Sequence, residues 1–129
     1  AMVAIGATAM SRHLPGQRMQ QSARELAAQL RYTRARALAT GQSQVFMLDA
    51  HTREWQAGES RNGKLPTGFD IVATGARNEQ QHEGVAAVRF FPEGAATGGR
   101  FVLSKGRAAW QVDVAWLTGE VTLARATPP

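Results

Sequence analysis

The stretch that decides the fold is residues 88–123, V-R-F-F-P-E-G-A-A-T-G-G-R-F-V-L-S-K-G-R-A-A-W-Q-V-D-V-A-W-L-T-G-E-V-T-L. Apolar and polar residues alternate along it between glycine-rich turns, which is the period of half-buried β-strands. The alternation separates two faces, with Trp110, Val112, Val114 and Trp116 on one and Gln111, Asp113 and Ala115 on the other. We expect a meander of three or four antiparallel strands, with Trp110 and Trp116 in the core.

Shorter strands precede this meander. Residues 44–49 form one, which pairs through a tight turn with a strand around Trp55, and residues 69–73 form another. Polar, turn-rich residues 58–68 indicate a loop, and residues 74–84 indicate an exposed connection. Within the meander we expect strands that pair with their neighbours in sequence, at 85–91, 100–104, 109–116 and 121–124.

A single helix is predicted before the strands, over residues 17–40. Its apolar positions follow one another at spacings of four, three, four, three and four, which marks one face of an amphipathic helix. These positions are Met19, Ala23, Leu26, Leu30, Thr33 and Ala37. Pro15 and Gly16 interrupt the pattern before the helix, and Gly41 is placed to end it.

The fold class that follows is α+β, with one helix packed on antiparallel β-structure. One helix cannot cover both faces of seven strands, so we expect two small sheets or one bent sheet. The length of 129 residues, with 43% hydrophobic and 19% charged residues, fits one domain at 17–129. Residues 1–16 begin uncharged and rich in small residues, as at the end of an apolar helix, although a frayed tail explains them equally well. No run in the sequence reaches the roughly 18 apolar residues that span a bilayer.

Basic character comes almost entirely from arginine, since thirteen Arg and two Lys give a formal net charge of +5. Four arginines stand off the apolar stripe of the predicted helix, namely Arg18, Arg24, Arg31 and Arg34. They form a candidate surface for an anion or a partner, such as nucleic acid or lipid headgroups. A solvated helix face is the simpler explanation, because any surface helix carries polar residues opposite its buried side.

No motif assembles a catalytic, cofactor or metal site. The glycine-rich residues 93–100 lack the spacing of a phosphate-binding loop and lead into a strand instead of a helix. Asp49, His51 and Glu54 can converge across a hairpin, but a polar turn explains them without a metal. The absence of cysteine excludes disulfides and thiol catalysis. We therefore expect no enzyme activity and no cofactor.

Two further residues have alternative explanations. Asp113 needs no partner on a solvated face, but on a covered face it needs an arginine such as Arg100 or Arg107. Trp55 can pack on the sheet edge or in a subunit contact, where tryptophan is enriched. The tryptophans could alternatively stack on nucleic-acid bases, although the phase of Trp110 and Trp116 favours the core.

The stretches F-F-P-E-G-A-A-T-G-G-R and V-D-V-A-W-L-T-G-E-V, following a single helix, resemble the soluble domain of a minor pseudopilin of the GspH/FimT type. The resemblance implies an N-terminal helix on antiparallel β-structure. It also implies a structural subunit at or near the tip of the periplasmic pseudopilus of a bacterial type II secretion system. An upstream helix would anchor it in the inner membrane, with Val3, Ile5 and Met10 as the end that packs in the filament core. Its implied partners are other minor and major pseudopilins and the secreted protein.

A second hypothesis from the same resemblance is a FimT-like minor pilin of a type IV pilus that binds DNA for uptake. The charge of +5 and the four helix arginines favour it. Residues 119–129, however, carry only Arg125 as a cation, whereas a phosphate-tracking surface gathers several. We therefore favour the role in secretion.

Overall fold

The computed structural model describes residues 15–75 and 84–127, and these contain one helix, α2 (Pro15–Thr40). The helix begins two residues earlier than predicted, because the N–H that proline lacks has no intrahelical acceptor in the first turn. It ends where the Gly41 N–H donates to the Ala37 carbonyl at 3.1 Å. Within the described residues no helix is long and apolar enough to cross a bilayer.

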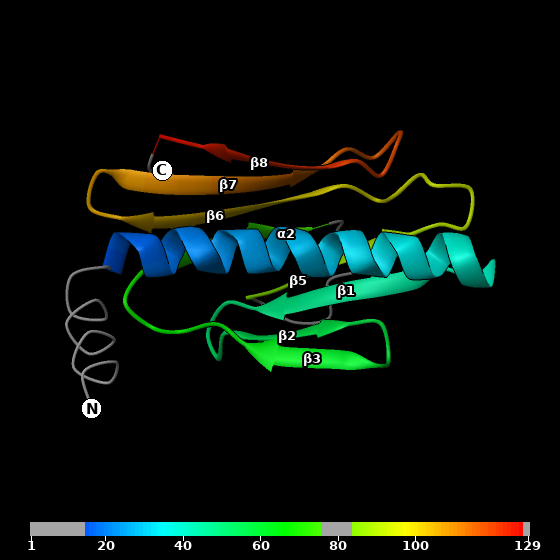
Figure 1. Cartoon of the computed structure of the whole chain (residues 1–129), viewed down its shortest axis with the longest axis horizontal. Helices are drawn as coiled ribbons and strands as arrows, with labels where there is room; N and C mark the ends of the chain where they lie inside the picture. Colours follow the sequence, from blue (N-terminus) through cyan, green and yellow to red (C-terminus); the bar gives the residue numbers. More distant parts are fainter. Residues whose placement is uncertain (1–14, 76–83, 128–129) are drawn as a thin grey trace, which may run out of the picture.

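The described strands form two antiparallel sheets of four (Figure 1). The first sheet has the order β3-β2-β1-β5, with strands Gln44–Asp49 (β1), Glu54–Ala57 (β2), Arg61–Lys64 (β3) and Val85–Phe90 (β5). The second sheet has the order β4-β6-β7-β8, with strands Asp70–Thr74 (β4), Gly99–Lys105 (β6), Ala108–Val114 (β7) and Val121–Arg125 (β8). The predicted class, one helix on two small antiparallel sheets, is confirmed.

Helix α2 packs on both sheets, contacting β1, β2 and β5 of the first and β6, β7 and β8 of the second. Figure 1 shows it running lengthwise between them. Seven of the side chains that it buries are each at most 1% exposed: Met19, Ala23, Leu26, Ala27, Leu30, Thr33 and Ala37. Within the core Phe46 of β1 meets Phe101 of β6 edge to face, with ring centroids 5.9 Å apart. One core therefore joins the helix and both sheets.

Strand β5 belongs to the first sheet, so the prediction that it pairs with the next strand in sequence is wrong. It pairs with β1 over six residues, from Gln44 opposite Phe90 to Asp49 opposite Val85. The Thr97 N–H donates to the Arg89 carbonyl at 2.9 Å, and the Arg89 N–H donates to the Thr97 hydroxyl at 3.0 Å. Pairing between neighbours in sequence is only a default, and here the connection through Thr97 carries the chain from one sheet to the other.

Strand β3 lies inside residues 58–68, which the sequence indicates as a loop, so that prediction is also wrong. Its residues R-N-G-K carry no apolar signal, yet they pair with β2. The Trp55 indole covers Gly63, where a Cβ would lie 2.6 Å from the ring. Trp55 itself is 9% exposed and stacks on Phe46 at 6.2 Å. Trp55 is therefore part of the core, and it stabilises the polar strand beside it.

Strand β7 ends at Val114, two residues before the predicted end. The Ala115 N–H donates to the Glu120 carbonyl at 2.9 Å and the Gly119 N–H donates to the Ala115 carbonyl at 2.7 Å, which closes a turn. Trp116 lies in this turn with 66% of its surface exposed, so the prediction that it is a core residue is wrong. Trp110 is half-buried and packs against the core.

The turn of residues 115–119 packs closely on Gly94 and on helix α2. Gly119 has φ 71°, and a Cβ there would collide with the Gly94 carbonyl oxygen and lie 3.0 Å from Arg34 Nε. Arg34 also donates from Nη2 to the Thr118 carbonyl at 3.3 Å. These contacts hold the turn against the C-terminal half of the helix.

Replacing Leu30 by Ala should lower the free energy of unfolding by about 2–5 kcal/mol, because the side chain is fully buried and leaves a cavity. The matched control is Leu38→Ala on the same helix, where 45% exposure predicts a loss of about 0.5 kcal/mol or less. Urea unfolding monitored by circular dichroism measures both variants. Equal losses would contradict the assignment of the helix face.

Replacing Gly119 by Ala should destabilise the protein more than replacing Gly106 by Ala. Both glycines have positive φ, which costs an alanine about 1–2 kcal/mol, but a Cβ at Gly106 has nothing within 4 Å. The difference between the two variants in the same unfolding assay isolates the close approach to Gly94. Identical midpoints would show that the turn moves away freely.

Candidate functional site

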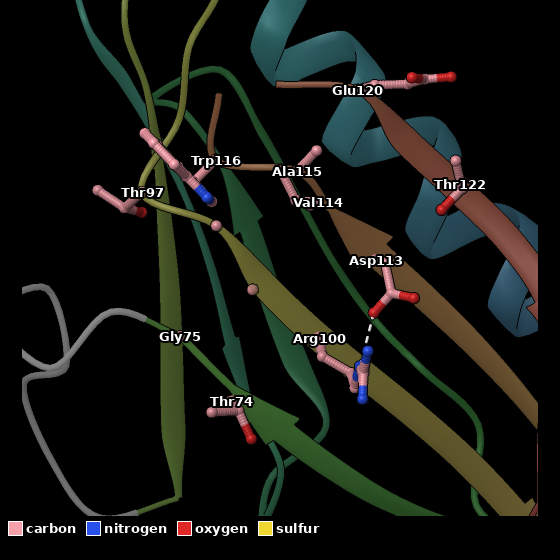
Figure 2. A pocket seen from close by; sticks show the side chains of 12 residues that line it. Thr74, Gly75, Thr97, Arg100, Asp113, Val114, Ala115, Trp116, Glu120 and Thr122 are labelled. Carbon is pink, nitrogen blue, oxygen red and sulfur yellow. Dashed lines mark hydrogen bonds and ion pairs between the residues drawn. The ribbon is translucent and has the colours of Figure 1, made fainter. Parts of the chain in front are cut away.

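An open groove of about 750 Å³ lies at the end of the second sheet where β7 ends and β8 begins (Figure 2). Four of its polar residues form one row across the sheet, in which Thr74 lies opposite Arg100, Arg100 opposite Asp113 and Asp113 opposite Thr122. The residues that alternate with this row, Phe101 and Val112, are buried. The row therefore faces away from the core.

Asp113 and Arg100 form the ion pair of the groove, with 2.7 Å between Arg100 Nε and Asp113 Oδ1. Gln111 Nε2 donates to the other carboxylate oxygen at 2.6 Å. The side chain of Arg100 is 61% exposed and that of Asp113 is 34% exposed, so this ion pair contributes little to stability. Its effect is to fix the orientation of the Arg100 guanidinium, and Arg100 is one of the two partners that the sequence suggested for Asp113.

Glycines bring the backbone close at the floor of this groove. A Cβ at Gly99 would lie 2.7 Å from Val88 Cγ2, and a Cβ at Gly75 would collide with the Ala87 carbonyl oxygen. The two sheets therefore meet along a seam at Gly75 and Gly99 where backbone approaches the neighbouring strand directly.

Trp116 stands at the end of the groove, and Figure 2 shows its side chain beside Thr97. Its carbonyl accepts the Ala96 N–H at 2.8 Å, which fixes the backbone at this point. Leu117, which follows it, is 67% exposed. An aromatic side chain at this level of exposure is suited to contact with another molecule. The sequence pattern missed it because the alternation of apolar residues continues past the end of β7.

Two arginines of the candidate basic surface bind carbonyl groups of the same chain. Arg31 donates from Nη2 to the Val121 carbonyl at 3.0 Å, and Arg34 donates to the Thr118 carbonyl at 3.3 Å. Arg18 and Arg24 are exposed on the helix. The structure thus does not bring the four arginines together as one free surface, because Arg31 and Arg34 connect helix α2 to β8 and to the turn.

Other arginines lie over aromatic rings. Their guanidinium carbons are 3.7 Å from the Tyr32 centroid for Arg61, 5.1 Å from the Phe69 centroid for Arg53 and 5.4 Å from the Trp110 centroid for Arg125. Each of these contacts is a cation–π interaction that packs the arginine stem on an apolar surface. The high arginine content therefore has a structural use that composition alone does not reveal.

The hairpin residues Asp49, His51 and Glu54 form a polar turn. Asp49 Oδ1 accepts the N–H groups of His51 at 2.9 Å and Thr52 at 3.3 Å. The backbone hydrogen bond from His51, followed by that from Thr52, lowers the pKa of the Asp49 carboxyl below its usual value. The part of the chain that the structure describes holds no group of three side chains able to bind a metal.

The glycine-rich segment 93–100 uses its N–H groups within the protein. The Gly94 N–H donates to the Phe91 carbonyl at 2.9 Å, and the N–H groups of Ala96 and Thr97 bind the carbonyls of Trp116 and Arg89. These three donors are therefore occupied and are not free to bind an anion. Val3, Ile5 and Met10, the predicted filament-packing residues, lie outside the described residues.

Comparisons with known proteins find relatives of this sequence and of this fold. The family model of the type II transport protein GspH matches residues 22–119. The type II secretion system protein H of Xanthomonas campestris pv. campestris is 43% identical over 117 residues, which cover 91% of this chain and 69% of that protein.

Two solved structures share the fold at low sequence identity. The minor pseudopilin EpsH of the Vibrio cholerae type 2 secretion system is 16% identical with a TM-score of 0.64, covering 82% of this chain and 95% of that one. The type IV minor pilin FimU of Pseudomonas aeruginosa is 16% identical with a TM-score of 0.66, covering 85% and 92%. Because the GspH model and the 43% identical relative both span most of the sequence, this chain belongs to the family of the type II transport protein GspH.

Proposed function

We propose that this chain is a minor pseudopilin of a bacterial type II secretion system, a structural subunit at or near the tip of the periplasmic pseudopilus. The observation that carries the proposal is the match to the GspH family over residues 22–119. The proposal is also supported by the 43% identity to a protein named for this secretion system. The role is non-covalent, namely to assemble with other pseudopilins and to assist the export of folded protein substrates.

The position of helix α2 supports a subunit of this kind. The chain enters the helix at Pro15, at one end of the molecule, and the same helix packs on both sheets. An apolar helix upstream, ending at Val3, Ile5 and Met10, would hold the subunit in the inner membrane and later in the filament core. Both sheets would then lie on the periplasmic side, packed on α2.

Capture of DNA by a type IV minor pilin is the alternative, and the net charge of +5 favours it. The likeness to FimU is one of fold alone. Binding of Arg31 and Arg34 to carbonyls of the same chain weighs against a continuous phosphate-binding face, because such a face needs several cations free on one side. We therefore retain secretion as the proposed role.

Deleting the gene should leave substrates of the secretion system in the periplasm, and the natural gene should restore their export. A gene carrying Val3→Asp, Ile5→Asp and Met10→Asp should fail, because three charges are costly in an apolar helix. Gln21→Asp, on the exposed face of α2, is the matched control. Activity of a secreted enzyme in medium and periplasm measures all four strains, and normal export in the deletion strain would contradict the proposal.

A titration of the protein with a short DNA duplex should give no micromolar binding near physiological salt. Fluorescence anisotropy at low and near-physiological salt measures it, because phosphate contacts lose affinity steeply as salt rises. Micromolar binding with a steep salt slope, abolished by Arg18→Ala and Arg24→Ala together, would favour DNA uptake. The control for that pair is Lys105→Ala, which removes an exposed cation from the second sheet.

A further inference from the structure

The exposed apolar side chains of this protein gather at one end of the molecule. Among the described residues four large apolar side chains are exposed, and three of them, Leu38, Trp116 and Leu117, lie where helix α2 ends. The fourth, Val72, is 49% exposed in the middle of β4. We call Leu38, Trp116 and Leu117 the end surface.

Leu38 and the turn that carries Trp116 and Leu117 both lie close to Gly94. Gly94 lies between the helix and the turn, since a Cβ there would be 3.9 Å from Leu38 Cδ2 and 4.0 Å from the Thr118 carbonyl oxygen. Figure 1 shows the turn that leads into β8 and the C-terminal end of α2 at the same end of the molecule. The exposed fractions are 45% at Leu38, 66% at Trp116 and 67% at Leu117, so this end of the molecule presents three large apolar side chains to solvent.

The surroundings of the end surface have the composition of a protein interface. Apolar residues occupy its centre, whereas the ion pair of Arg100 with Asp113 and the exposed Glu120 lie in the adjoining groove. Interfaces combine an apolar centre, in which tryptophan is enriched, with a polar rim. The backbone of the turn is already fixed by its bonds to Ala96 and Arg34, so little order would be lost on binding.

The direction of helix α2 indicates which neighbour the end surface faces. Leu38 of the end surface lies 23 residues after Pro15 on the same helix, about 35 Å at the rise of an α-helix. A subunit held in a filament through the chain upstream of Pro15 turns this end toward its neighbour farther from the membrane. We propose that the end surface binds the next subunit of the pseudopilus, an inference that rests on the proposed function.

The partner is a different pseudopilin and not a second copy of this chain. Head-to-tail stacking of two copies would set the end surface against the opposite end of the domain, and none of the four exposed large apolar residues lies at that end within the described residues. Two copies would also each carry a charge of +5, which opposes their association. The expected partner presents an apolar surface to Trp116 and Leu117.

The test uses thiol labelling in cells, because the 129 residues contain no cysteine. The full-length protein carrying Leu117→Cys, produced from its own locus, is labelled with a maleimide in permeabilised cells and compared with unsubstituted protein. Labelling should fall severalfold when the other pseudopilins are present relative to a strain that lacks them. Val72→Cys, the matched exposed position, should label equally in both strains.

Equal labelling of Leu117→Cys in both strains would overturn the proposal, as would protection of Val72→Cys alone. Disulfide-linked dimers of Leu117→Cys would show that a second copy occupies the surface, which overturns the choice of partner. Measuring the export of substrates distinguishes a failure of this proposal from a failure of the proposed function. Normal export without the gene contradicts the function, whereas impaired export with unprotected Leu117→Cys contradicts only the end surface.

Substitutions to alanine give an independent readout. Trp116→Ala with Leu117→Ala should reduce export severalfold at an unchanged protein level, since both side chains are exposed and their loss leaves the core intact. Val72→Ala should export normally. Normal export by the double variant would contradict the proposal.

Discussion

Both sheets depend on the buried face of helix α2, which supplies a layer that they share. A small sheet must bury its apolar face against another element, and here one helix covers two sheets at once. The three alanines Ala23, Ala27 and Ala37 are fully buried in this contact and leave room for a close approach. Phe46 and Phe101 come from different sheets and meet in the same core. Loss of the helix would expose both apolar faces together.

Much of the fold could be predicted because its signal is local. The spacing of Met19, Leu26 and Leu30 indicates a helix face, and the two-residue period indicates β1, β6 and β8. The features that sequence reasoning missed, one strand and one strand pairing, depend on distant residues. Strand β3 forms beside Trp55 of its neighbour, and β5 pairs with β1 across a long stretch of chain. Neither pairing can be recognised from the sequence of the strands that form it.

In the candidate site, too, some features could be predicted from the sequence and others could not. Arg100 could be named as a candidate partner for Asp113 on a covered face, and it lies directly opposite, although the face that they share is turned away from the core. The exposure of Trp116 could not, since the apolar alternation continues into the turn. Arginine content was also ambiguous, because the same side chain serves a solvent face, a carbonyl or an aromatic ring. The hydrogen bond from Arg31 to the Val121 carbonyl could not be predicted, because it depends on the packing of helix α2 beside strand β8.

The glycine seam between the sheets has a mechanical consequence. Gly75 approaches the backbone of Ala87 and Gly99 approaches the side chain of Val88, and a pull across that line would separate these contacts one after another. Helix α2 is bonded to the second sheet through Arg31 and packs along the first. A force along the helix axis therefore loads both sheets in parallel as shear, so that many contacts resist together.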